Sequence, residues 1–117
     1  MMNSEDWKEL CDKHKTDKAS YGWFYPQALE QYRDKPIKIL EIGVQDGYSI
    51  QMFNEYFSNA QIYGLDIGEL WKGNKKLNKT NITIFKGNQS RIKTLHNLYN
   101  ETGPLDIIID DGSQSSK

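Results

Sequence analysis

The stretch "IKILEIGVQDGYS", residues 37–49, decides the fold. Its first six residues are too uniformly apolar for a strand with one face in water, which favours a strand buried in a parallel sheet. Gly43 and Gly47 follow in a short turn, and Ile50, Phe53 and Phe57 then recur at helical spacing. A strand, a tight glycine turn and a helix form the arrangement in which open α/β sheets hold a ligand.

Apolar runs separated by helical segments continue to the end of the chain. They predict an α/β fold with a parallel sheet covered on both faces, whose strands span residues 37–42, 61–66, 82–86 and 105–110. A helix between the last two strands is expected to begin at a Ser90 cap and to end at Gly103 and Pro104. Its apolar stripe would be Ile92, Leu95, His96 and Tyr99. A helix is also expected between the second and third strands, in a connection that is polar and broken by glycine.

Residues 1–35 are predicted to form an N-terminal helical and aromatic cap, and residues 36–117 the sheet domain. A first helix, capped by Ser4, would carry Leu10, Cys11 and His14 on one stripe. Cys11 and His14 are better explained as core residues than as metal ligands, because two such residues do not make a site. A second, short helix would open at Pro26.

Composition excludes several classes of function. The chain has 117 residues and a formal net charge of −1, which gives one domain at most and no field for nucleic acid or an anionic membrane. The single cysteine excludes an internal disulfide and indicates a reducing compartment. Neither a signal-peptide core nor a run of about 18 apolar residues occurs, so we expect a cytoplasmic protein.

The glycine spacing excludes two nucleotide-binding motifs. A dinucleotide fingerprint would need glycines where Gln45 and Tyr48 stand, which disfavours a nicotinamide-dependent oxidoreductase. A phosphate-binding P-loop would need a Gly-Lys-Ser/Thr sequence, and the turn has none. Acids remain at the predicted strand ends, Glu41 on the first strand and Asp66 on the second, followed by Asn88, Gln89 and Ser90 after the third.

This set resembles the class I S-adenosylmethionine-dependent methyltransferases. Five segments resemble, more narrowly and in register, the O-methyltransferases of the macrocin and mycinamicin type that act on macrolide sugars: "KTDKASYGWFY", "LEIGVQDGYS", "GLDI", "GNQS" and "IIIDDGSQ". The resemblance implies a Rossmann-like fold and S-adenosylmethionine as cofactor. Since that fold has seven strands and this chain supplies four, the chain is expected to be an N-terminal half, truncated after the fourth strand.

The resemblance also implies roles for residues. Asp66 would accept both ribose hydroxyls, since a carboxylate can bind a diol. The cofactor-binding set would be Glu41, Gly43, Gly47, Tyr48, Asp66, Ile67, Asn88, Gln89, Ser90 and Asp110. Asp110 and Asp111 would bind Mg²⁺ and Asp111 would serve in catalysis, because a metal lowers the pKa of an acceptor hydroxyl. Gln114 stands where the family has a histidine base, and a neutral amide cannot accept that proton.

Plainer explanations stay open for these residues. Glu41 and Asp66 could be solvated strand ends, and the glycines could serve the turn alone. Asp110 and Asp111 could punctuate a turn, and residues 88–90 could form a plain helix cap. The aromatic cluster Tyr21, Trp23, Phe24 and Tyr25 fits either the mouth of a cofactor pocket or a cover for the end of the sheet.

Two functions therefore fit the sequence. The first is a sugar or natural-product O-methyltransferase, present as its cofactor-binding part and inactive by itself, whose partner would be a small hydroxyl acceptor. The second is a non-catalytic cofactor-binding or assembly module that forms homo-oligomers through the open edge of its fourth strand.

Overall fold

A computed structural model describes residues 4–14 and 29–110. Its centre is a four-stranded sheet in the order β3-β2-β1-β4, and all three pairings are parallel. The strands are β1 (Ile37–Ile42), β2 (Ala60–Asp66), β3 (Ile82–Lys86) and β4 (Ile107–Asp110). The predicted parallel α/β sheet is thus confirmed, with the first and third strands as predicted and the second beginning one residue earlier.

The fourth strand begins two residues later than predicted. Asp106 explains the delay, because its Oδ2 accepts the backbone N–H of Lys38 at 2.9 Å. The backbone N–H of Asp106 in turn donates to the carbonyl oxygen of Lys38 at 2.8 Å. A side chain therefore takes a bond that a strand carbonyl would otherwise make, and regular pairing starts at Ile107.

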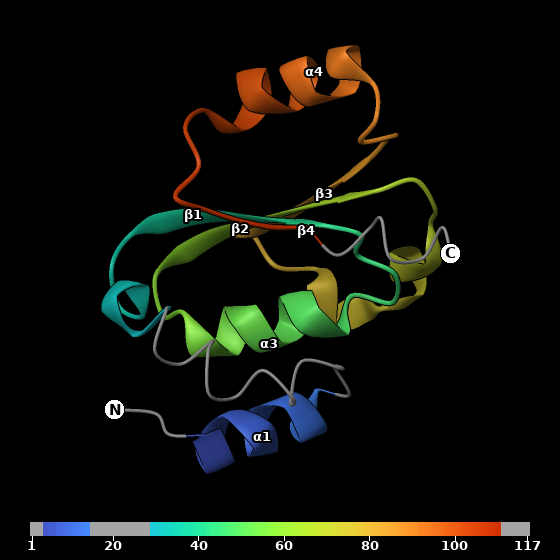
Figure 1. Cartoon of the computed structure of the whole chain (residues 1–117). Helices are drawn as coiled ribbons and strands as arrows, with labels where there is room; N and C mark the ends of the chain where they lie inside the picture. The colour runs from blue at the N-terminus through green and yellow to red at the C-terminus, as the bar shows by residue number, and fades with distance from the viewer. Residues whose placement is uncertain (1–3, 15–28, 111–117) are drawn as a thin grey trace.

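Helices lie on both sides of the sheet, as Figure 1 shows: α1 (Ser4–Lys13) and α3 (Tyr48–Tyr56) on one side, and α4 (Ile92–Thr102) on the other. The polar connection after β2 contains two short 3₁₀ helices, η3 (Leu70–Gly73) and η4 (Lys75–Leu77). The helix predicted from Pro26 begins outside the described residues, and within them only η2 (Glu30–Tyr32) corresponds to it. In the part of the chain that the structure describes, no helix has the length and apolar character needed to cross a membrane.

The main core lies between the sheet and α3. The predicted stripe of Ile50, Phe53 and Phe57 is buried there at 0–1% exposure, against Ile39 and Ile62 of the strands. Each such side chain contributes about 1.5–3 kcal/mol on burial, so this face supplies most of the hydrophobic stabilisation. Cys11 is also buried in this cluster, as expected of a core residue.

The α4 side is less covered than predicted. Leu98 and Thr102 are the buried residues of α4, whereas Ile92 is 85% exposed and Tyr99 54% exposed. The predicted apolar stripe therefore faces away from the sheet. Ile108 of β4 is 59% exposed, so the expectation of a sheet covered on both faces is wrong at this edge.

The start of α4 also differs from the prediction, while its end agrees. The N-cap residue is Arg91 rather than Ser90, and no side chain caps the helix. Ser90 donates its N–H and its hydroxyl to Oδ1 of Asn88, so it is used in a turn instead. Gly103, with φ +72°, closes the helix as predicted.

Candidate functional site

The glycine turn between β1 and α3 has a left-handed backbone at three residues. Gly43 and Gly47 have φ values of +90° and +87°, and Gln45 has φ +54°. A positive φ is disfavoured for residues other than glycine, and a hydrogen bond stabilises this backbone conformation at Gln45. Its N–H donates to Oδ2 of Asp66 at 2.5 Å. The turn is therefore fixed from the neighbouring strand.

Gly47 has a second constraint besides its backbone angle. A Cβ atom at this position would lie 2.4 Å from Cδ1 of Leu77, a residue of η4 that is 6% exposed. The missing side chain thus lets the connection after β2 pack against the turn. Both the backbone angle and the packing of Leu77 favour glycine here, and a role of Gly47 in binding a cofactor stays a prediction.

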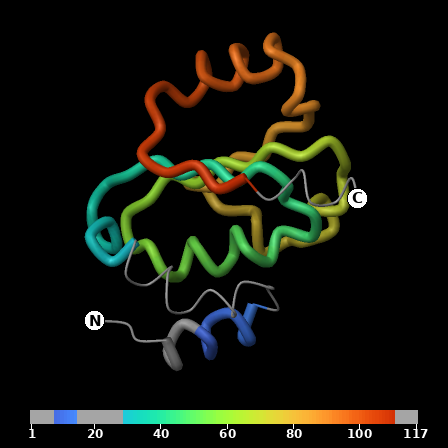
Figure 2. Tube along the Cα trace, in the orientation of Figure 1, coloured from blue at the N-terminus to red at the C-terminus, as the bar shows by residue number. Residues whose placement is uncertain are grey.

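Asp66 ends β2 and joins two loops. Its Oδ2 accepts the N–H of Gln45, and its Oδ1 accepts the N–H of Gly68 at 2.8 Å. A carboxylate oxygen has two lone pairs, so both oxygens can accept a further hydrogen bond. Figure 2 shows the two loops leaving the sheet at its right-hand end. Ile67, the next residue, is 67% exposed and offers apolar surface there.

Glu41 is placed differently from Asp66. It is 1% exposed and pairs in register with Gly64 of β2. Side chains alternate along a strand, and Ile37 and Ile39 belong to the core cluster with α3, so Glu41 points to the α3 side. It is an enclosed acid behind the turn rather than a solvated strand end. Tyr48, the first residue of α3, is partly buried.

The segment after β3 lies at the same edge as Asp66. The N–H of Gly87 donates to the carbonyl oxygen of Asp66 at 2.9 Å, which anchors the segment beside the end of β2. Asn88 and Ser90 bond to each other in a turn. Gln89 carries a buried Oε1 atom that has no hydrogen-bond partner among the described residues. A buried acceptor of this kind costs free energy unless a donor reaches it.

Of the two predicted metal ligands, the structure describes Asp110. Asp110 is the exposed last residue of β4, in register with Ile42, so it lies at the strand end beside the glycine turn. Asp111 lies outside the described residues. Within residues 4–14 and 29–110, no group of three or more His, Cys, Asp or Glu side chains is arranged to hold a metal ion.

Charges near the site are balanced locally. Glu69 lies 2.7 Å from Nζ of Lys72 and 3.3 Å from Nζ of Lys86. Hydrogen bonds from Lys72 and Lys86 lower the pKa of Glu69. These pairs are on the surface, so they stabilise the fold little.

A residue that sequence reasoning missed also holds the glycine turn. Asn74, between η3 and η4, donates through Nδ2 to the carbonyl oxygen of Asp46 at 2.9 Å. Nothing in the local sequence marks this bond, because α3, β2 and η3 separate its two residues along the chain. Only the asparagine's ability to cap the following turn, where Oδ1 accepts the N–H of Lys76 at 3.1 Å, could have been predicted.

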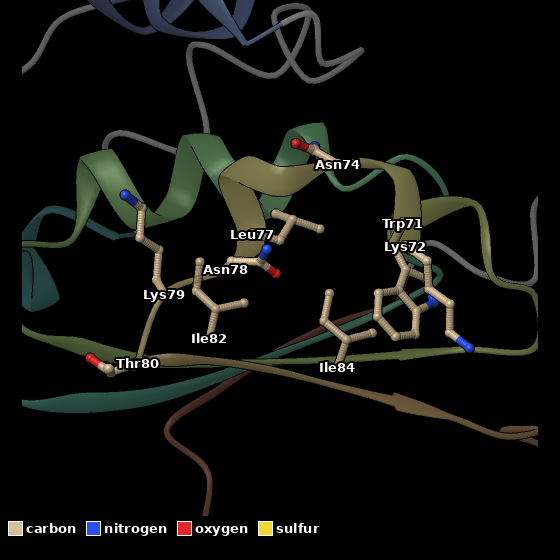
Figure 3. A pocket seen from close by; sticks show the side chains of 9 residues that line it. All are labelled: Trp71, Lys72, Asn74, Leu77, Asn78, Lys79, Thr80, Ile82 and Ile84. Carbon is tan, nitrogen blue, oxygen red and sulfur yellow. The ribbon is translucent and has the colours of Figure 1, made fainter.

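A cavity of about 560 Å³ opens beside β3, and Asp66 is not among the residues that line it. Figure 3 shows Ile82 and Ile84 of the strand pointing toward Leu77 and Trp71. Its lining is Trp71, Lys72, Asn74, Leu77, Asn78, Lys79, Thr80, Ile82 and Ile84. None of these belongs to the predicted cofactor set, although Asn74 and Leu77 also contact the glycine turn.

Comparison with known proteins identifies relatives of this chain. No family model matches the chain. Mycinamicin VI 2''-O-methyltransferase of Micromonospora griseorubida is 33% identical over 119 residues, which cover 92% of this chain and 29% of the relative. Demethylmacrocin O-methyltransferase of Streptomyces fradiae is 34% identical with the same coverage. This chain is a relative of the macrocin- and mycinamicin-type O-methyltransferases. The resemblance inferred from the sequence is confirmed.

Solved structures agree with these relatives. The methyltransferase MycE, in complex with Mg and SAH, superposes with a TM-score of 0.75 at 32% identity over 93% of this chain. A second MycE structure, which also holds mycinamycin VI, gives 0.73 at 32% identity over 95% of this chain. The fold is therefore the Rossmann-like methyltransferase fold. The chain spans 28–29% of the length of these relatives and structures.

Proposed function

We propose that this chain binds S-adenosylmethionine at the carboxyl edge of its sheet and is the cofactor-binding part of a sugar O-methyltransferase. The observation that carries the proposal is the bond between Asp66 and the N–H of Gln45. It brings the acid that ends β2 against the glycine turn that follows β1. An adenosyl cofactor needs these two features side by side, one for its ribose and one for its amino-acid part.

The described residues fit such a cofactor. Asp66 has lone pairs left for the ribose hydroxyls, and Ile67 offers exposed apolar surface for a purine ring. The buried Oε1 of Gln89 fits a donor such as the adenine amino group. Bound in this way, the cofactor supplies an electrophilic methyl group. The other proposed contacts are Glu41 and Tyr48 behind the turn, Gly43 and Gly47 within it, and Asn88, Ser90 and Asp110 at the neighbouring strand ends.

The proposal also covers the acceptor, the metal and the cellular location. The acceptor class, a sugar hydroxyl of a natural product, follows from the activities of the relatives. Magnesium, a ligand of MycE, would be bound by Asp110 and Asp111, because hard cations prefer carboxylate oxygens. Asp111 would also act in catalysis. The cytoplasmic location rests on the single cysteine.

Isothermal titration calorimetry with S-adenosylhomocysteine (SAH) tests the proposal. Ile67→Ser should weaken binding about five- to ten-fold, because it removes apolar surface from the ring site. Stability should not change, since Ile67 is largely exposed. Asp66→Asn should weaken SAH binding and also the hydrogen bonds that hold the two loops at the end of β2. Asp12→Asn, on the exposed face of α1, is the matched control. The absence of heat from the wild type at millimolar SAH, or an equal response to NAD, would refute the proposal.

Turnover is a separate question. We expect the 117-residue chain alone to transfer no methyl group at a useful rate, since it spans under a third of each relative's length. Methylation of a sugar hydroxyl by the purified chain would contradict this expectation.

A second candidate function, an assembly module, is favoured by the surface beside β4. This strand lies at the edge of the sheet, and Ile108 is exposed on its α4 side. Ile92, Leu95 and Tyr99 are exposed on α4 by 85%, 40% and 54%. A strand edge left unpaired by the described residues, together with exposed apolar side chains, favours pairing with a second copy. Analytical ultracentrifugation should then detect a dimer that Ile108→Asp dissociates, whereas a monomeric wild type would exclude this function.

A further inference from the structure

A chain of hydrogen bonds runs from α1 through α3 to the glycine turn. Nε2 of His14 lies 3.0 Å from Oε1 of Glu55, and Nδ1 of His14 lies 3.1 Å from Nε2 of Gln51. Oε1 of Gln51 accepts a bond from Nδ2 of Asn74, which also donates to the carbonyl oxygen of Asp46. Each bond joins residues far apart in sequence, so the chain links four segments: the residue after α1, α3, the connection between η3 and η4, and the glycine turn.

The direction of every bond in this chain is fixed from one end. The carbonyl oxygen of Asp46 can only accept and the N–H of Lys76 can only donate, so the amide of Asn74 has one possible orientation. Gln51 must then present Oε1 to Asn74 and its NH₂ group to His14. Nδ1 of His14 must accept, and its proton must lie on Nε2, facing Glu55.

Burial makes this order difficult to replace. Gln51 is 8% exposed and the side chain of His14 is 12% exposed. Water cannot readily supply a lost partner at such positions. Within the described residues, the ionisable groups facing His14 are Glu55 and, through the same carboxylate oxygen, Lys13 at 2.8 Å. Hydrogen bonds from Lys13 and His14 lower the pKa of Glu55, so this acid stays charged in mildly acidic solution.

We propose that Asn74 is a positioning residue for the glycine turn. Its Nδ2 atom donates to the carbonyl oxygen of Asp46, and the N–H of Lys76 together with Oε1 of Gln51 holds the amide in the orientation that this bond needs. Without the bond to Asp46 the turn would loosen. The consequence for cofactor affinity rests on the proposed cofactor site.

The first test compares Asn74→Asp with Asn78→Asp. The first variant loses both donors with almost no change in shape, and the second makes the same change at an exposed residue of the same connection. Asn74→Asp should weaken SAH binding about ten-fold, the value of one net hydrogen bond, while Asn78→Asp should stay within about two-fold of the wild type. Equal affinity of both variants would overturn the proposal.

The second test examines the direction of the bonds at His14. Long-range ¹H–¹⁵N spectra should show the neutral imidazole protonated at Nε2, because Nδ1 accepts from Gln51. The opposite tautomer would contradict the order of bonds on which the orientation of Asn74 depends.

A third measurement separates this proposal from the proposed function. If the wild type binds no SAH, the proposed function fails, but the turn can still be examined by hydrogen exchange at constant pH. Asn74→Asp should speed exchange of the Gln45 and Gly47 amides about ten-fold, and Asn78→Asp should leave it unchanged. Unchanged exchange in Asn74→Asp would overturn the positioning role, whatever the cofactor result.

Discussion

Gly47→Ala is expected to destabilise the fold before it affects any ligand. The residue sits at φ +87°, and its new Cβ would lie 2.4 Å from Cδ1 of Leu77 and 3.2 Å from Cγ. Leu77 is buried in the core cluster at 6% exposure, so it has little room to move. Two separate costs therefore add at one position, one from the backbone and one from packing.

Each cost can be sized. A left-handed conformation costs an L-residue about 1–2 kcal/mol, and overpacking of a core costs about 1–3 kcal/mol. Together they predict a loss of about 3 kcal/mol, a large share of the roughly 5–15 kcal/mol of a typical domain. Combining Gly47→Ala with Leu77→Ala should remove the packing part. In that background Gly47→Ala should cost only about 1–2 kcal/mol.

Urea unfolding monitored by circular dichroism measures these changes. Gly73→Ala is the matched control, because a Cβ there would meet no atom within 4 Å. Its unfolding midpoint should stay close to that of the wild type. If Gly47→Ala unfolds at the wild-type midpoint yet loses SAH affinity, the glycine serves ligand approach rather than packing, and our reasoning about this turn is wrong.

Three further predictions concern stability. Burial raises the pKa of Tyr56 to about 12 from an ordinary value of 10.0. The free energy of unfolding of the wild type should therefore fall by up to about 2 kcal/mol as pH rises from 10 through about 12. Urea unfolding of Tyr56→Phe over the same pH range should lack this fall. Leu98→Ala should cost about 2–5 kcal/mol and the exposed Leu95→Ala under about 1 kcal/mol by thermal unfolding. Hydrogen bonds from Lys13 and His14 lower the pKa of Glu55. Above pH 4.5, Glu55→Gln should therefore be less stable than the wild type by under about 1 kcal/mol. Unfolding measured at decreasing pH should show this difference vanish below pH 4.5.

Local periodicity accounts for the parts of the fold that could be predicted. The strand at residues 37–42 and the stripe Ile50, Phe53 and Phe57 follow from spacing along the chain, and the structure confirms both. The prediction for α4 was wrong because it too used only spacing along the chain. Spacing shows that Ile92, Leu95 and Tyr99 share a face, but it cannot say that Leu98, on an adjacent face, meets the sheet.

In the candidate site too, some features could be predicted from the sequence and others could not. Glycines in a turn and an acid at a strand end are visible in the sequence, and so is the family resemblance they carry. The bond from Gln45 to Asp66 spans 21 residues, and the bond from Asn74 to Asp46 spans 28. The enclosure of Glu41 depends on how α3 packs over the sheet.

The sequence by itself determined the parallel sheet, the order of its elements and the residue types available at its carboxyl edge, because these depend on neighbours within a few positions. Only the tertiary structure decided which of those residues touch. It assigned Gly47 to packing against Leu77, Asp66 to fixing the turn, and His14 to a polar chain that ends at Asp46. Hydrogen-bond direction and close packing arise between elements brought together by folding, and no local pattern encodes them.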